Sequence, residues 1–256
     1  MQQYRADLHV HTLLSPCGDL EMSPAHIVEA AARRNIQILG IADHNTTKHG
    51  PLIKKMAEKK GIFTLCGAEV TTKEETHCLA FFENNEILDV FQQYLDAHLP
   101  DIKNDPKYFG YQVVIDEDEM IVEEVEKLLI SGISQSLGQL EKKVHELNGL
   151  FIPAHIDRPK YSLISQLGFV PPDINADAFE ISKFTTREEM VKKFPYLKDF
   201  SFIRSSDAHY PDQIGNSTTM FEMEELSFEG VRRALREGRV LIEDGRRKTG
   251  DRRTEE

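Results

Sequence analysis

Short apolar segments alternate with amphipathic ones along most of the chain. The apolar segments contain few polar residues, as is typical of strands buried on both faces of a sheet. We expect seven strands, at residues 6–11, 36–42, 62–66, 77–82, 151–154, 178–181 and 202–205. The segments between most of them carry apolar residues at helical spacing. The pattern therefore predicts an α/β fold in which strands and helices alternate around a barrel-like parallel sheet.

Capping residues mark several of the expected helices. Ser23 is followed by Pro24, the combination of an N-cap and a first-turn proline. Thr186 and Glu189 have the spacing of a capping box, which predicts another helix start. A last helix is expected at 227–236, because Gly238 follows it closely.

The stretch from about 84 to 148 departs from this rhythm. It begins with a predicted helix at about 85–98, and further on come a strand-like segment at 111–115 and an acidic turn at 116–119. We interpret 84–148 as an insertion beside the barrel. The barrel domain would then span 1–243, and the charged residues 244–256 would form a disordered tail.

Composition limits the classes of protein to consider. A chain of 256 residues with 40% hydrophobic content suits one barrel domain. The net charge of −12 argues against a general nucleic-acid surface, so we expect no stable nucleic-acid partner. A small phosphorylated substrate stays compatible, because bound metal ions reverse the local field. The odd number of cysteines, three, and the lack of a signal-like or membrane-length apolar run favour a cytoplasmic protein without a membrane partner. The sequence does not indicate the oligomeric state.

Histidines and acids lie where the predicted strands end. His9 and His11 are two residues apart, so both side chains point to the same face of a strand. Further candidates at strand ends are His44, Glu69, His77, His155, Asp207 and His209. Imidazole and carboxylate groups bind zinc, manganese and iron, and barrel active sites lie at the carboxyl ends of the strands. The sequence therefore predicts a multinuclear metal site. The histidines expected to be structural are His26, His49, His98 and His145.

Three motifs together resemble one known family. They are Leu8-His9-Val10-His11-Thr12, Ala42-Asp43-His44-Asn45 and Ser206-Asp207-Ala208-His209. In their order they resemble the PHP (polymerase and histidinol phosphatase) family, over about residues 4–82 and 149–243. The resemblance implies a distorted (β/α)7 barrel of the PHP type with two or three divalent metal ions, which would be zinc, manganese or iron. It also implies hydrolysis of phosphoesters.

The resemblance further implies a division of the ligands. A first metal would be held by His9, His11, Glu69 and Asp207. Glu69 would bridge to a second metal, bound also by His77 and His155. A third would take His44, His209 and an acid near the first motif. We expect Asp19 there, with Cys17 and Glu21 as alternatives, and Cys17 would bring a zinc preference. Asp43 is expected to orient a ligating histidine rather than to bind metal.

The expected reaction follows from two ions about 3.5–4 Å apart, which can share a hydroxide that attacks phosphorus. A metal-bound water or one of the outer histidines, with His209 as the candidate, would protonate the leaving group. Arg158 is the main candidate to bind the phosphate, and Lys183 and Arg204 are further ones. A histidinol-phosphatase-like monoesterase and a non-catalytic, metal-bound regulatory module are the alternatives.

Overall fold

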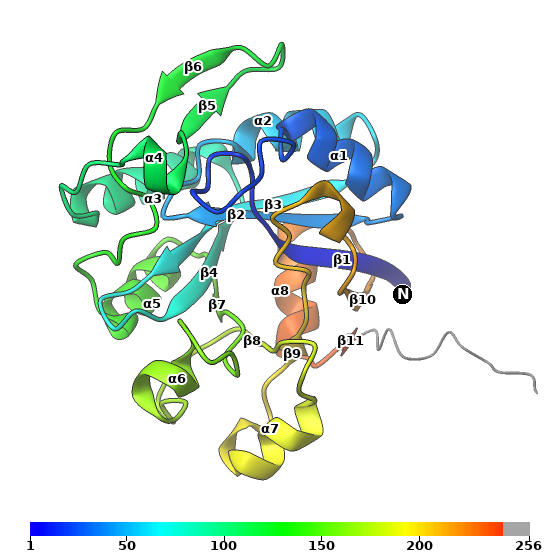
Figure 1. Ribbon diagram of the computed structural model, residues 1–256. Helices are drawn as coiled ribbons and strands as arrows, with labels where there is room; N and C mark the ends of the chain where they lie inside the picture. Colours follow the sequence, from blue (N-terminus) through cyan, green and yellow to red (C-terminus); the bar gives the residue numbers. More distant parts are fainter. Residues whose placement is uncertain (243–256) are drawn as a thin grey trace, which may run out of the picture.

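A strongly curved, seven-stranded mixed sheet forms the centre of the computed structural model, which describes residues 1–242 (Figure 1). Its strands, in hydrogen-bonding order, are β11 (Val240–Ile242), β10 (Thr219–Met223), β1 (Gln2–Val10), β2 (Ile38–His44), β3 (Phe63–Thr71), β4 (His77–Phe82) and β7 (Leu150–Pro153). As predicted, β1, β2 and β3 are parallel. However, β4 runs antiparallel to β3, because only a short turn joins the two strands. The expectation of a parallel sheet therefore holds for part of it.

Two shorter strands extend the curve. β8 (Phe179–Glu180) and β9 (Phe202–Ile203) form a parallel pair. The main-chain N–H of Ile156, just after β7, donates to the carbonyl of Glu180 at 2.9 Å. On the other side, His11 N–H donates to the carbonyl of Ala208, beyond β9, at 3.0 Å. These contacts lead from β7 through β8 and β9 back to β1. The PHP-type barrel expected from the sequence is therefore confirmed, and each of its seven predicted strands is present.

Helices cover both faces of the sheet. α1 (Pro24–Arg33) and α2 (Gly50–Glu58) pack on β2 through a cluster that includes Leu39 and Ile41. α8 (Phe228–Arg236) packs on the opposite face, with Ile38 and Ala42 of β2. The alternation of these β2 residues between two apolar clusters explains why the strand is buried throughout. The expected caps are also present: Ser23 caps α1, and Thr186 with Glu189 forms the capping box of α7 (Arg187–Lys193).

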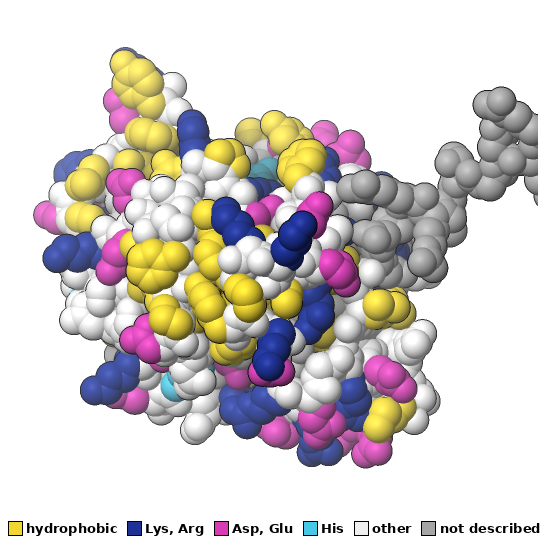
Figure 2. All heavy atoms as spheres, turned by 90° about the horizontal axis from the view of Figure 1, so that it is seen from below, with side chains coloured by type: hydrophobic (Ala, Val, Ile, Leu, Met, Phe, Trp, Pro, Cys, Tyr) yellow, Lys and Arg dark blue, Asp and Glu magenta, His cyan; other side chains and the backbone are white. Residues whose placement is uncertain are grey.

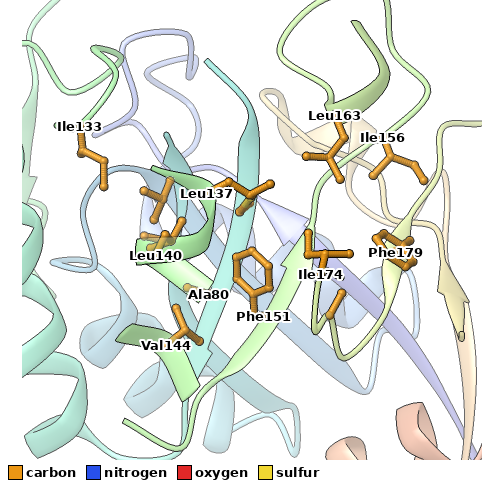
Figure 3. Packing of buried hydrophobic residues seen from close by; sticks show 14 of the residues in the cluster. Ala80, Ile133, Leu137, Leu140, Val144, Phe151, Ile156, Leu163, Ile174 and Phe179 are labelled. Atoms are coloured by element: carbon orange, nitrogen blue, oxygen red, sulfur yellow. The ribbon is translucent and has the colours of Figure 1, made fainter. Parts of the chain in front are cut away.

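The segment 84–148 shares the core of the barrel. It contains α3 (Asn85–His98), α4 (Pro106–Phe109), β5 (Val113–Ile115), β6 (Ile121–Glu124) and α5 (Leu137–Glu146). Figure 3 shows Leu140 and Val144 of α5 beside Ala80 of β4 and Phe151 of β7, within one cluster. By contrast, the β5–β6 hairpin projects from the body of the molecule (Figure 1). This packing joins α5 to the core of the barrel, and the interpretation of 84–148 as an insertion, with its boundaries, stays a prediction.

A short helix, α6 (Leu163–Leu167), follows β7. On the face shown in Figure 2, basic and acidic side chains alternate and little histidine is visible. Within residues 1–242, none of the helices has the length and apolar character needed to cross a membrane. The charged tail expected at 244–256 lies outside the described residues.

Candidate metal centre

Five strands bring histidines and acids to one edge of the barrel. His9, His44 and Glu69 lie near the carboxyl ends of the parallel strands β1, β2 and β3. His77 is the first residue of β4, and His155 comes just after β7. Because β4 is antiparallel to β3, its first residue lies at the same edge as the end of β3. All five side chains are buried, so the edge encloses a polar cluster.

The first group of donor atoms surrounds the Nε2 atoms of the histidine pair. His11 Nε2 lies 3.2 Å from His9 Nε2, 3.2 Å from Asp207 Oδ1 and 3.4 Å from Glu69 Oε2. His9 Nε2 lies 3.3 Å from Glu69 Oε1 and 3.4 Å from Asp207 Oδ1. Atoms at about 2.0–2.2 Å from one ion lie about 3.3–3.6 Å from one another in tetrahedral geometry, and closer in octahedral geometry. Of the four residues expected to hold the first metal, His9, His11 and Glu69 thus form one compact donor group, and Asp207 Oδ1 lies beside both of its histidines.

The second group is centred on one oxygen of Glu69. Glu69 Oε1 lies 2.8 Å from His77 Nδ1 and 3.0 Å from His155 Nε2. The same carboxylate faces His9 and His11, so it stands between the first and second groups. This is the arrangement expected of a carboxylate that bridges two ions.

The third group differs from the expectation. His11, Cys17, His44 and His209 offer donor atoms that all lie within 4.8 Å of one another. Asp19 belongs to no such group in the described part of the chain. Its carboxylate instead accepts the main-chain N–H of Glu21 at 2.8 Å, which holds it in the loop. The structure therefore places Cys17, and not Asp19, beside His44 and His209.

Hydrogen bonds fix which nitrogen each histidine presents to the cluster. His9 Nδ1 donates to Glu180 Oε2 at 3.0 Å. His11 Nδ1 faces Ser15 Oγ at 3.0 Å, and Ser15 Oγ itself donates to Asp43. Each Nδ1 therefore carries the proton, which leaves the lone pair of Nε2 directed into the cluster.

His209 follows the same rule. Its Nδ1 donates to the main-chain carbonyl of Asp207 at 2.8 Å, so the lone pair of its Nε2 faces the Sγ atom of Cys17 at 3.0 Å. A ring whose lone pair points at neighbouring donor atoms is suited to ligation.

Electrostatics also favour cations here. Burial would raise the pKa of Glu69, but His77, His9 and His44 hold it well below its ordinary value. The pKa of Asp207 is likewise held well below its ordinary value by His9 and His11 despite burial. Burial lowers the pKa of His44 far below its usual range, so this imidazole is neutral. By contrast, the carboxylates around His9 and His11 raise the pKa of both imidazoles despite burial, so an ion that binds there would displace protons. Carboxylate and imidazole together are the donor set of divalent transition metals.

Several buried donors lack partners. The atoms His44 Nδ1, His77 Nε2 and His155 Nδ1 make no hydrogen bond within residues 1–242. Leaving buried polar atoms unpaired is costly, and native structures rarely do so without a functional reason. Only His44 Nδ1 among them faces the cluster, because His77 and His155 face Glu69 with their other nitrogens. The spacing of the donor atoms, together with the unpaired His44 Nδ1, shows that the residues fit a metal site.

Supporting residues surround the donor atoms. Asp43 accepts hydrogen bonds from Thr12 Oγ1 at 2.8 Å and Ser15 Oγ at 2.6 Å, so it acts on His11 through Ser15, as expected for an orienting residue. His49 contacts Thr12 Oγ1 and accepts the N–H of Ile115 in β5, which joins the hairpin to this network. It lies outside the donor groups, as do His26, His98 and His145.

Glu180 is a functional candidate that the sequence analysis did not include. Its buried carboxylate contacts His9 Nδ1 and accepts the main-chain N–H of His155 at 3.0 Å. The signal was present, because Glu180 is an acid inside an otherwise apolar predicted strand.

Two of the candidate ligands have unusual backbones. The φ angle is 29° at His155 and 52° at Asp207. Positive φ values cost energy for residues other than glycine and concentrate at functional sites.

A cleft of about 650 Å³ opens beside the cluster, and His155, Asp207 and His209 form part of its wall. Arg158 and Lys183, two expected phosphate-binding residues, also line it. The guanidinium of Arg158 pairs with Asp207 Oδ2. Arg204 does not fit the expectation. Its side chain is buried, donates to the main-chain carbonyl of Thr185 at 2.7 Å and lines a different pocket.

Known proteins resemble this chain over most of its length. The uncharacterized protein YqxK of Bacillus subtilis is 25% identical over 92% of this chain and 62% of its own length. A structure described as a putative metal-dependent phosphoesterase from Bifidobacterium adolescentis covers 90% of this chain and 95% of that chain, with 21% identity and a TM-score of 0.59.

Endonuclease Q of Pyrococcus furiosus, described as lesion-specific, has a TM-score of 0.70 and 19% identity, covering 94% of this chain and 58% of that chain. This chain thus spans less than two thirds of YqxK and of endonuclease Q. Endonuclease Q has also been solved in complex with a 27-mer duplex that has an abasic lesion at the active site. A protein of this fold therefore binds DNA, and the expectation of no nucleic-acid partner, which was based on net charge, is wrong. Net charge does not describe the surface around one cleft.

Family models settle the classification. The model described as PHP domain matches residues 7–158, and the one described as PHP-associated matches residues 192–240. The first match alone covers more than half of the chain and includes the His9–His11 pair, Glu69 and His155. The resemblance noted in the sequence is confirmed, and this chain belongs to the PHP domain family.

Proposed function

We propose that this protein is a metal-dependent hydrolase of phosphoesters in a small phosphorylated metabolite or a nucleotide. The observation that carries the proposal is the position of Glu69, which stands between two groups of histidines: Oε2 faces His11, and Oε1 faces His9, His77 and His155. Such a carboxylate can join two ions at the short separation that phosphoester hydrolysis uses.

The chain's own residues would have distinct roles. His9, His11, Glu69 and Asp207 would hold one ion, and Glu69, His77 and His155 a second. His44 and His209 would hold a third, whose remaining donor is considered below. When bound, the ions would activate water and offset the charge that builds up on the phosphoryl oxygens. Zinc, manganese and iron all suit these donors.

Residues of the cleft would position the substrate. Arg158 and Lys183 lie on its wall and can donate to phosphate oxygens. Phe184 is 81% exposed beside them and offers an apolar surface to the rest of the substrate. His209 lies at the boundary between the cleft and the cluster, but it is not suited to protonate the leaving group, because its Nδ1 proton is donated to the carbonyl of Asp207 and because burial and His11 lower its pKa to about 4.

A nucleic-acid substrate is the second candidate. It is favoured by the likeness to endonuclease Q, which extends over 94% of this chain. The cleft accommodates either candidate, because Arg158, Lys183 and Phe184 would contact a phosphate and its neighbouring group in both cases.

The proposal is tested with p-nitrophenyl phosphate and bis-p-nitrophenyl phosphate. The protein is stripped with a chelator, reloaded separately with Mn²⁺, Zn²⁺ or Fe²⁺, and compared with His9→Ala under the same conditions. We expect turnover only after reloading, and background rates for His9→Ala.

A panel of phosphorylated metabolites, nucleotides and short DNA duplexes then separates the two candidates. A preference for histidinol phosphate would identify the monoesterase alternative. The absence of turnover on every substrate, with metal bound, would contradict the proposal and favour a regulatory module.

A further inference from the structure

Cys17 occupies the position in which an acid was expected. The loop after β1 folds back through main-chain bonds from Ser15 N to Thr12 O at 3.1 Å and from Gly18 N to Ser15 O at 2.8 Å. A Cβ atom at Gly18 would lie 2.2 Å from the Thr12 carbonyl oxygen, so only glycine fits there. This tight loop directs Cys17 towards His209 and turns Asp19 away.

The surroundings of Cys17 differ from those of the other two cysteines. Cys66 and Cys78 are buried within the apolar core, whereas the Sγ atom of Cys17 faces the Nε2 lone pair of His209 at 3.0 Å. If only Cys17 and His209 were considered, an ordinary S–H···N hydrogen bond would be enough to pair both atoms.

A hydrogen bond between Cys17 and His209 would leave the buried side chain of His44 without a partner, among the described residues, for its Nδ1 atom. This side chain is 4% exposed, belongs to the same group of donors, and its Nδ1 atom has no hydrogen-bond partner within residues 1–242. Glu69 Oε2 lies 3.2 Å away from that atom without hydrogen-bond geometry. His44 belongs to the group of Cys17 and His209 and also to a group with Glu69 and His77, so an ion held by either group would satisfy it.

We propose that the thiolate of Cys17 is a ligand of the third metal, with His44 and His209, and that it makes this one position selective for zinc. The inference rests on the proposed function, because it assumes the same metal centre. The first and second groups offer only nitrogen and oxygen, which can also hold manganese when it is in excess, whereas a thiolate favours softer ions such as zinc. The thiol proton would pass to solvent when the ion binds.

Cobalt is the probe, because a thiolate bound to Co²⁺ gives a charge-transfer band in the near ultraviolet. Metal-free protein is titrated with Co²⁺ as the wild type and as Cys17→Ser and Cys17→Asp. We expect the band in the wild type and its loss in both variants. Cys17→Asp should still bind a third ion through its carboxylate.

Two variants serve as matched controls. Cys66→Ala removes a core thiol and Asp19→Asn removes the rival acid, and both should retain the band and all bound ions. In a second measurement, dialysis against excess Mn²⁺ after zinc loading should leave about one zinc per chain in the wild type and none in Cys17→Asp.

The outcomes separate this inference from the proposed function. A wild type that binds Co²⁺ without the band, or Cys17→Ser that retains it, would overturn the thiolate assignment and leave the hydrolase proposal intact. A protein that binds no cobalt would contradict both.

Discussion

Glu69 is the residue on which the proposed centre depends most. It is 1% exposed, and its two oxygens lie within 3.4 Å of nitrogens from His9, His11, His44, His77 and His155. Its carboxylate can remain ionised in the interior only because this many nitrogens surround it. The outer carboxylates Glu180 and Asp43 fix the tautomers of His9 and, through Ser15, of His11.

Removing an outer carboxylate should weaken the centre without removing a ligand. Glu180→Gln leaves the shape unchanged but takes away the charge that orients His9. We expect a loss of about 10–100-fold in metal affinity, measured by competition with a chromogenic chelator. Glu188→Gln, an exposed acid on α7, is the matched control and should bind metal like the wild type. Unchanged affinity in Glu180→Gln would show that Glu180 does not orient a ligand.

At this scale the sequence predicted most of the residues that converge. His9, His11 and Glu69 could be identified because strand ends meet at one edge of a barrel. The choice of Asp19 over Cys17 does not agree with the donor groups of the structure, because the position of both residues depends on how the loop folds around Gly18. Arg204 was a wrong candidate for the cleft because a position near a strand end does not say into which pocket a long side chain turns.

The pairing of β3 with β4 is the element that completes the site. It places His77 opposite Thr71 and beside Glu69. The strands approach closely at Gly67, where a Cβ atom would lie 1.8 Å from the carbonyl oxygen of Ala80. Because this carbonyl oxygen belongs to the main chain of β4, a side chain at position 67 would force β3 or β4 to shift.

Two glycine substitutions test this element. Gly67→Ala should destabilise the fold by about 1–3 kcal/mol or more through overpacking, and should weaken metal binding as His77 moves. Gly138→Ala, in α5, meets no atom within 4 Å and should stabilise by about 0.5–1 kcal/mol. Urea unfolding measures both free energies. Equal effects of the two substitutions would contradict the packing described at β3.

The sequence predicted the positions of strands and helices better than it predicted the directions of the strands. The strand at 77–82 was expected with its correct bounds, but periodicity gives no strand direction, so its antiparallel course was missed. β10, which pairs antiparallel with β1, and α5 were also missed. Tertiary packing on the sheet stabilises both, and that packing leaves little signal in a local pattern.

At the scale of the molecule, the barrel interior is apolar at one end and charged at the other. Strands β1–β4 and β7 contribute to a cluster that α8 covers, while their opposite ends hold the donor groups. Concentrating imidazoles and carboxylates in a buried volume lowers stability unless cations neutralise them. Folding and metal binding should therefore be coupled.

Metal removal tests this coupling. A ligand that binds only the folded state stabilises it by about 2.7 kcal/mol when its concentration is 100 times the dissociation constant. Chelator-treated protein should accordingly unfold at a lower urea concentration than protein reloaded with Zn²⁺. The free energy of unfolding should differ by about 3 kcal/mol or more between the two. Identical unfolding curves would indicate that the cluster does not bind the ion in the folded state.

Anomalous diffraction from crystals grown with zinc, recorded on both sides of the zinc absorption edge, tests the central claim most directly. We expect three anomalous peaks per chain. One should lie among His9, His11, Glu69 and Asp207, one among Glu69, His77 and His155, and one beside His44 and His209. A map without peaks at the edge where these strands end, or with ions only at surface carboxylates, would contradict the account.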